Sequence, residues 1–403
     1  DVADDGLILR RHLRGGGKML LRDDEEVHGG QGANILEGVA ELVLIDLVAG
    51  NFPGADLTKQ AIRHMTSSLF QMFCNALRGY FGLDMNTPTE ELIAYREKRV
   101  AEDRIQYFKD MFTDANLIGF LVDFGFPVNH ANALRPEEIA ASKEDMKDYI
   151  VKSLDRIEWV ANDILEQKEL LDFDEFARRY EANVRTMIKE KDLIALKSLV
   201  SYTTGLEVKV LPEKEVREGY YRYLCDRTSR ADEKIIRDYC FCKACEICQE
   251  LDIPMQVHTA FGDSPLCDLG KCNPLNMYEV INAYKETKLI LIHAGYPFCE
   301  ELGFLMNHYE NVYGDVSSMV PYAGYAGETK IKELLELAPT TKLMYGTDGG
   351  LVPDGIWWGA KMFRSYFSNI LQELMDKNYI SATFAREMAE NIMYKNVRRI
   401  YKF

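Results

Sequence analysis

The sequence predicts an α/β protein in which strands and helices alternate. From residue 41 onward, near-continuous apolar runs of strand length recur, which is typical of parallel strands that helices cover on both faces. Longer helical patterns separate most of these runs, for example at 90–111, 235–251 and 276–286. Because eight strand candidates follow one another in one series, the pattern favours a TIM-like (β/α)8 barrel over an open sheet.

The predicted strands have unequal signals. In chain order they are the runs at 42–47, 117–123, 150–154, 193–200, 254–259, 289–293, 312–316 and 343–346. The third run gives the weakest signal, because it is short and Lys152 and Ser153 interrupt it. Two longer intervals, about 55–115 and 155–190, are predicted to be helical insertions into the barrel.

Residues 1–40 differ in composition from the rest of the chain. They hold eight of the 28 glycines and the acidic run at 23–26. Such a segment offers little apolar surface, so we predict a loose arm at 1–40 and the barrel at 41–403. His12 and His28 lie in this arm and are expected to be exposed polar residues.

Composition and charge exclude several classes of partner. The 403 residues include 48 Lys and Arg against 64 Asp and Glu, which gives a net charge of −16. Nucleic-acid binding needs clustered positive charge, so no nucleic acid is expected. No apolar run approaches the roughly 20 residues of a membrane span, so no membrane is expected either. The nine cysteines, an odd number in a long chain, predict a reducing cytoplasmic location.

Polar residues end three of the late strands, where a barrel carries its functional groups. His258 ends the run at 254–259, His293 ends the run at 289–293, and Asp348 follows the run at 343–346. Two imidazoles and a carboxylate suit a Zn²⁺-type ion, which takes nitrogen and oxygen ligands in a compact shell. Such an ion would acidify a bound water, and Asp348 would accept the proton.

Lys197 belongs with these residues because it interrupts the apolar strand at 193–200. A lysine in such a place must pair, lose its charge or be modified. One interpretation is an ion pair inside the barrel mouth. The other is a lysine carbamylated by CO₂, which would present a carboxylate to the metal.

Several segments carry a resemblance to a known family. They read Gln-Val-His-Thr-Ala-Phe-Gly-Asp at 256–263, Leu-Ile-His-Ala-Gly-Tyr-Pro at 291–297 and Tyr-Gly-Thr-Asp-Gly at 345–349; further matches lie at 196–206, 272–275, 311–317 and 335–339. In them the chain resembles the amidohydrolase superfamily, specifically the amidohydrolase-2 type with FluG/nodulin-like members. The resemblance implies a TIM barrel that catalyses metal-dependent hydrolysis of a C–N bond in a small amide-like metabolite. Decarboxylases use the same scaffold, so decarboxylation stays an alternative.

The resemblance also implies a set of metal ligands. In two-metal relatives, the second ion rests on a modified lysine and two strand-end histidines, and the last-strand aspartate serves the first ion. The matching residues are Lys197, His258, His293 and Asp348, of which His293 and Asp348 would also be catalytic. The divalent ion implied is most simply Zn²⁺, and the protein would act on a small molecule. Barrels of this type often form homodimers, so a homodimer is an expected assembly.

The first predicted strand departs from the family pattern. Relatives end this strand in Asp-x-His-x-His, whereas Val48 and Gly50 occupy the two histidine positions here. Neither side chain can bind a metal. The protein would therefore hold a single ion in an unusual place, or it would be a catalytically silent barrel kept for binding. His64, a short way downstream, is expected to be structural.

Other polar residues near the strand ends are candidates for substrate binding. Asp263, Asn273, Tyr296 and Arg156 would line the pocket, but Asp263 and Asn273 could equally cap turns, and Arg156 could form a salt bridge. The cysteines at 240, 242, 245 and 248 lie within one helical pattern. A helix spreads such residues around its circumference, so we expect buried thiols and no tetrahedral metal site.

Overall fold

The computed structural model describes residues 67–123, 140, 143–144, 146–167, 171–262, 267–348 and 353–403. The predicted N-terminal arm, the predicted first strand with Val48 and Gly50, His64 and Asp263 lie outside the described residues. The chain divides into two units. The sheet unit comprises 119–317, 331–346 and 374–403, and the helical unit comprises the chain up to 118, 318–330 and 347–373.

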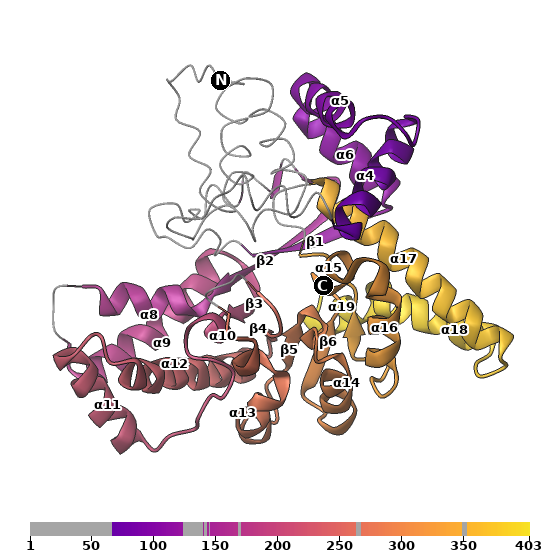
Figure 1. Cartoon of the computed structure of the whole chain (residues 1–403). Coiled ribbons are helices and arrows are strands. Elements are labelled where there is room, and N and C mark those ends of the chain that lie inside the picture. Colours follow the sequence, from indigo (N-terminus) through magenta and orange to yellow (C-terminus); the bar gives the residue numbers. More distant parts are fainter. Residues whose placement is uncertain are drawn as a thin grey trace. The chain divides into compact units, whose positions relative to one another are not determined.

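The sheet unit contains seven parallel strands whose order in the sheet is their order in the sequence (Figure 1). Their bounds are β1 Gly119–Asp123, β2 Ile150–Arg156, β3 Leu193–Ser198, β4 Met255–His258, β5 Leu289–Ile292, β6 Val312–Asp315 and β7 Leu343–Met344. Each coincides with one of the predicted strands from the second to the eighth, and these seven predictions are confirmed. An all-parallel sheet in sequential order is the topology that a (β/α)8 barrel requires.

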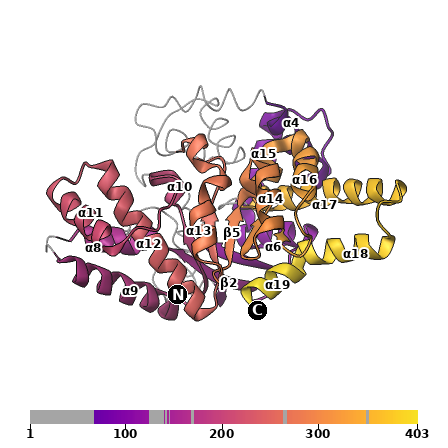
Figure 2. The ribbon, with the colours of Figure 1, turned by 90° about the horizontal axis from the view of Figure 1, so that it is seen from below.

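Helices follow the strands in the sheet unit. They are α8 Ile157–Leu165, α9 Phe173–Glu190, α10 Val200–Thr203, α11 Glu213–Cys225, α12 Arg230–Leu251, α13 Tyr278–Ala283, α14 Cys299–His308, α18 Ala382–Glu390 and α19 Asn396–Tyr401, with short turns η3 Leu269–Cys272, η4 Pro274–Met277, η5 His293–Gly295 and η7 Asn391–Lys395. Helices α8, α9, α11 and α12 pack together, and α9 and α12 contact β3 (Figure 2). No helix among the described residues is long and apolar enough to cross a membrane.

Helix α9 illustrates how the sequence determines these elements. Asp172 caps its N-terminus by accepting a hydrogen bond from the Glu175 backbone N–H at 2.8 Å. Phe173, Phe176 and Tyr180 follow at helical spacing and are buried. The helix therefore begins at a strong cap and buries one apolar stripe.

Helix α12 carries the four clustered cysteines as buried free thiols, as predicted. Burial raises the pKa of Cys242 to about 11 and raises the pKa values of Cys240, Cys245 and Cys248 further. Thiols that stay protonated are poor metal ligands, because the thiolate is the ligand.

The interior face of the sheet forms an apolar core. It is built by Leu154, Ala195, Ile290, Ile292 and Met344 from four strands, and Ile400 and Tyr401 of α19 complete it. Strand β2 gave the weakest sequence signal but runs for seven residues. Two of its polar residues have partners: the Lys152 ammonium lies 5.7 Å from the centre of the Phe403 ring, and Asp155 pairs with Lys191 at 2.5 Å.

The helical unit contains α4 Ser68–Phe81, α5 Thr89–Glu102, α6 Arg104–Asp114, α15 Met319–Ala323 and the turn η6 Gly324–Ala326; α16 Gly327–Leu335 and α17 Pro353–Asp376 begin in it. A buried cluster joins three of these helices. The Arg96 guanidinium lies 2.8 Å from Asp354 Oδ2, and the Tyr107 hydroxyl donates to Asp354 Oδ1 at 2.5 Å. This cluster fixes the start of α17 against α5 and α6.

Candidate active site

Five strands end in a polar residue on the interior face of the sheet. Asp123, Arg156, Lys197, His258 and Asp315 stand at the last positions of β1, β2, β3, β4 and β6 or directly beside them. The strand register places these residues on the face that carries the apolar core, at the carboxyl ends of their strands. This end of a parallel barrel is where active sites lie. The sequence analysis found Arg156, Lys197 and His258 but missed the two aspartates.

Lys197 and Arg156 converge on Asp123. The Lys197 ammonium lies 3.0 Å from Asp123 Oδ2, and Arg156 Nε lies 2.9 Å from the same oxygen. Burial raises the pKa of Asp123, but the two cations outweigh that effect and lower it overall. This is the ion-pair arrangement that the sequence left open for both Lys197 and Arg156. An ammonium group has no lone pair, so Lys197 in this state is a cation and not a ligand.

His293 reaches the site through an unusual backbone. Strand β5 ends at Ile292, whose side chain faces the core, so the next residue of a regular strand would face away. Instead the chain turns, with φ of 70° at His293 and 57° at Ala294. Such angles are uncommon outside glycine and mark a functional constraint. The turn places the His293 ring 4.5 Å from the His258 ring.

Hydrogen-bond partners define the tautomers of both histidines. His258 Nε2 lies 3.1 Å from the Phe261 carbonyl oxygen, which can only accept, so Nε2 carries a hydrogen. Ser317 Oγ donates to Asp315 Oδ1 at 2.6 Å and therefore accepts from His293 Nδ1 at 2.8 Å. In neutral rings the remaining nitrogens, His258 Nδ1 and His293 Nε2, then carry lone pairs. These two nitrogens face each other at 3.0 Å.

Tyr202 of α10 covers His258, with ring centres 4.4 Å apart. Glycine at position 262 leaves room for the Tyr202 ring, because a Cβ there would lie 2.3 Å from the Tyr202 hydroxyl oxygen. The sequence analysis did not single out Tyr202, since only the fold brings the segment after β3 to the end of β4.

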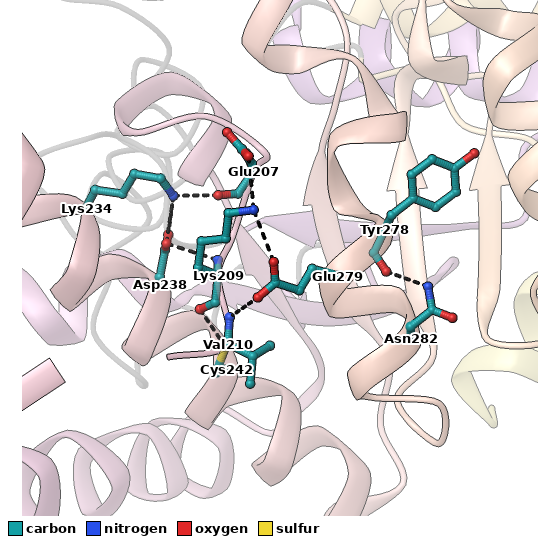
Figure 3. Close-up of polar contacts among 9 residues, drawn as sticks. All are labelled: Glu207, Lys209, Val210, Lys234, Asp238, Cys242, Tyr278, Glu279 and Asn282. Atoms are coloured by element: carbon teal, nitrogen blue, oxygen red, sulfur yellow. Dashed lines mark hydrogen bonds and ion pairs between the residues drawn. The ribbon is translucent and has the colours of Figure 1, made fainter. Parts of the chain in front are cut away.

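The segment that follows α10 is anchored by carboxylates (Figure 3). The Lys209 backbone N–H donates to Asp238 Oδ2 at 3.0 Å, and the Val210 N–H donates to Glu279 Oε1 at 2.8 Å. Lys234 adds a bond to the Glu207 carbonyl at 2.6 Å. Charged side chains of α12 and α13 therefore replace strand pairing here and fix the loop that begins beside Tyr202.

Asp348 lies in the helical unit and is exposed. Its backbone has φ of 53°, and its Oδ2 accepts a hydrogen bond from Ser318 Oγ at 2.6 Å. The Ser318 N–H in turn donates to the Thr347 carbonyl at 3.1 Å. The carboxylate is thus oriented by a hydroxyl group, and its role as metal ligand and base stays a prediction.

The predicted substrate-binding residues have local partners. Asn273 Oδ1 accepts from the Leu275 N–H at 2.9 Å and caps η4, which is the turn-capping interpretation. The Tyr296 ring packs edge-on against Phe261 at 5.3 Å, and the Tyr296 carbonyl accepts from the Phe261 N–H at 2.9 Å. Tyr296 therefore joins the loops that follow β4 and β5.

Comparison with known proteins shows what the chain is similar to. A sequence model of the amidohydrolase family matches residues 205–403, which contain His258, His293, Asp315 and Asp348. FluG of Emericella nidulans is 28% identical over 243 residues, which are 57% of this chain and 28% of FluG. The second half of the chain is therefore similar to the amidohydrolase family. The chain spans less than a third of the length of FluG.

Solved structures confirm the predicted fold class of the chain. A protein from Lactobacillus casei, provisionally named a metal-dependent hydrolase, has a TM-score of 0.71 and 18% identity, covering 93% of this chain and 91% of its own. Uronate isomerase from Thermotoga maritima has a TM-score of 0.64 and 14% identity, covering 93% of this chain and 89% of its own. Both likenesses concern the fold.

The similarity to amidohydrolases implies a divalent metal, and the site fits one in part. Within the described ranges, no three or more His, Cys, Asp or Glu side chains gather to hold an ion. The two facing lone pairs of His258 and His293 are nevertheless suitable donors. Nitrogens bound at about 2.0–2.1 Å in a tetrahedral shell stand about 3.3 Å apart. The observed separation of 3.0 Å is close to that value.

Proposed function

We propose that this protein is a metal-dependent hydrolase that acts on the C–N bond of a small amide-like metabolite. The observation that carries the proposal is the pair of imidazole nitrogens of His258 and His293, 3.0 Å apart. Each ring donates its other N–H to a fixed acceptor, and such outer partners are typical of metal-ligating histidines. Two ring nitrogens at this distance share either a proton or a metal ion, and the proposal places a divalent ion between them.

His258 and His293 would hold the ion, most simply a single Zn²⁺. When bound, such an ion polarises a carbonyl group and lowers the pKa of a bound water. Asp348 would receive the proton at its carboxylate and return it to the leaving amine. Lys197 would assist as a bridging group if carbamylated, or as a cation that contacts the substrate. One ion is proposed because Val48 and Gly50 stand where relatives have two further histidines.

The substrate would be a small molecule that carries negative charge. Arg156 and Lys197 place two cations against one carboxylate at the strand ends, which leaves one positive charge in excess among these three groups. An anionic group on the substrate would match that excess. Asp263, Asn273 and Tyr296, from the loops after β4 and β5, would contact the rest of the substrate.

A catalytically silent barrel used for binding is the second candidate. The observation that favours it is that the described residues supply two imidazoles but no third ligand in the same cluster. Decarboxylation on the same scaffold would use the same histidines, so it differs from the leading proposal in reaction and not in site.

Metal content separates the two candidates. Protein purified without chelator is expected to contain about one Zn²⁺ equivalent, and added zinc is expected to raise the melting temperature of metal-free protein. His258→Ala should remove both effects. His308→Ala is the matched control, because His308 is an exposed histidine of α14 whose Nδ1 lies 3.0 Å from the Phe304 carbonyl oxygen in the same helix. Metal-free protein whose melting temperature ignores zinc would favour the silent barrel.

A further inference from the structure

Asp315 is a hydrogen-bond hub that the proposed function does not use. Its Oδ1 atom accepts from three donors: the His293 backbone N–H at 2.9 Å, the Ser317 N–H at 3.0 Å and Ser317 Oγ at 2.6 Å. Ser317 is buried, with 5% of its surface exposed. All three donors belong to the segments that directly follow β5 and β6.

The first of these bonds acts on the backbone of His293. That residue has φ of 70°, in the left-handed region that side chains other than glycine seldom adopt. The carboxylate of Asp315 holds the N–H of this residue, and a hydrogen bond to a charged acceptor is stronger than one between neutral groups. The bond thus stabilises the turn that brings the imidazole to His258.

The third bond acts on the ring of His293. A serine hydroxyl has a single hydrogen, and Asp315 takes it at 2.6 Å, because two acceptors at that distance would repel each other. Ser317 Oγ must therefore accept from His293 Nδ1–H. This leaves the lone pair on Nε2, which faces His258.

The same hydrogen positions exclude Ser317 as a nucleophile activated by His293. An activating base would need a lone pair on Nδ1, directed at the serine proton. Here the serine proton is directed to Asp315, and Nδ1 carries its own hydrogen.

We infer that Asp315 and Ser317 are positioning residues for His293: the carboxylate fixes its backbone turn, and the serine hydroxyl fixes its ring as the Nδ1–H tautomer. The inference rests on the proposed function only for its consequence, which is that Nε2 is ready to bind a divalent cation. The close packing of Gly346 keeps the pair in place, since a Cβ there would lie 3.1 Å from Ser317 Cβ.

A second serine–carboxylate pair supplies a matched control. Ser198 Oγ, at the end of β3, donates to Glu158 Oε1 at 2.6 Å and accepts from the Val200 N–H at 3.2 Å. Ser198 is fully buried, and its hydroxyl also donates to a carboxylate. The hydroxyl of Ser198 accepts from a backbone N–H, whereas the hydroxyl of Ser317 accepts from the His293 imidazole. Ser198→Ala therefore removes an equivalent hydroxyl without changing the hydrogen bonds from Asp315 and Ser317 to His293.

The test measures the tautomer of His293 in metal-free full-length protein labelled with ¹⁵N-histidine, at about pH 8, where ordinary imidazoles are neutral. The His293 signals are assigned by their loss in His293→Ala. Two-bond ¹H–¹⁵N correlations should show Nδ1–H in the native chain and in Ser198→Ala. Ser317→Ala should shift His293 toward Nε2–H. A native chain with Nε2–H, or an unshifted Ser317→Ala, would overturn the inference.

Zinc affinity, measured by competition with a chelator, gives a second readout. Ser317→Ala and Asp315→Ala should weaken Zn²⁺ binding ~10–100-fold, the effect typical of lost outer partners of a metal ligand, and Ser198→Ala should stay within about twofold. Asp315→Asn keeps an acceptor oxygen at Oδ1 and should lose less zinc affinity than Asp315→Ala. The asparagine variant also provides a test if the alanine variant fails to fold. Equal affinity in all variants would contradict the inference. A native chain that binds no zinc contradicts the proposed function instead, and the tautomer measurement then still decides the inference.

Discussion

The two sides of the candidate site solve the same problem of burying polar groups in different ways. On β1 to β3, Arg156 and Lys197 both pair with the Asp123 carboxylate, at 2.9 and 3.0 Å. On β4 to β6, His258 and His293 are instead aligned by directional hydrogen bonds that leave two lone pairs facing each other. On the first side every charged group has an ion-pair partner, whereas the second side offers two ring nitrogens that a divalent cation would bind under the proposed function. Variants on the two sides should therefore change different properties: stability on the ion-pair side, metal binding and turnover on the histidine side.

The largest effect is expected in turnover, for the base that would serve the histidine side. Asp348→Asn should keep the fold and reduce turnover of any accepted substrate ~10²–10⁴-fold, because an amide cannot accept and return a proton. Ser318→Ala, which removes the hydroxyl that donates to Asp348, is the control. If Asp348 merely holds the turn, both variants will turn over at the native rate.

The next effect should be a loss of stability on the ion-pair side. Asp123→Ala leaves two buried cations without their shared partner and should lower the free energy of unfolding by about 3–5 kcal/mol. Urea denaturation measures this change. The control is Glu218→Ala, which breaks an exposed pair with Lys214 and should cost less than about 1 kcal/mol. Equal losses in the two variants would show that the Asp123 cluster is no more important than a surface pair.

A Lys197 variant can show whether this residue belongs to the ion-pair side or to the histidine side. If it is a cation paired with Asp123, as the geometry has it, Lys197→Met should lower stability by about 2 kcal/mol, the scale of a hydrogen bond between charged groups, and leave zinc content unchanged. Elemental analysis of protein grown with and without added bicarbonate measures the second quantity. Loss of zinc in Lys197→Met would instead place a carbamylated lysine on the histidine side.

The smallest effect concerns Glu158, which lies beside the ion-pair side. Burial raises its pKa, although the Ser198 hydroxyl lowers it in part. The native protein therefore holds the Glu158 proton more tightly than the unfolded chain does, and the ionised carboxylate weakens the native state at neutral pH. Glu158→Gln should gain about 1 kcal/mol at neutral pH, the scale of one buried hydrogen bond.

This gain should shrink as the pH falls and vanish below the unfolded pKa of about 4.3, because native Glu158 is then protonated and equally neutral. Urea denaturation across this pH range provides the measurement. A gain that is independent of pH would mean that the pKa of Glu158 is the same in the native and in the unfolded protein.

Much of the fold could be predicted from local sequence. Seven of the predicted strands coincide with observed strands, because strands of a parallel sheet that helices cover on both faces are near-continuous apolar runs. The cysteines of α12 were also predictable, because helical periodicity alone separates their side chains. His258, Lys197 and Arg156 stood out as polar residues at the ends of apolar runs.

Asp123 and Asp315 did not stand out, because an aspartate that follows a strand is usually a turn residue. Only the parallel register shows that Asp123 lies beside Arg156 and Lys197, which come from the two following strands. Tyr202 was missed for the same reason, since its contact with His258 joins segments after different strands.

The sequence by itself determined which residues form the strands and which chemical groups stand at their ends, because both follow from the order of apolar and polar side chains along one segment. The tertiary structure decided what those groups do. Whether Lys197 is a cation depends on Asp123 two strands away, and which nitrogen of His293 has the lone pair depends on a serine after the next strand. Charge state and tautomer are properties of contacts between segments, and no single segment contains them.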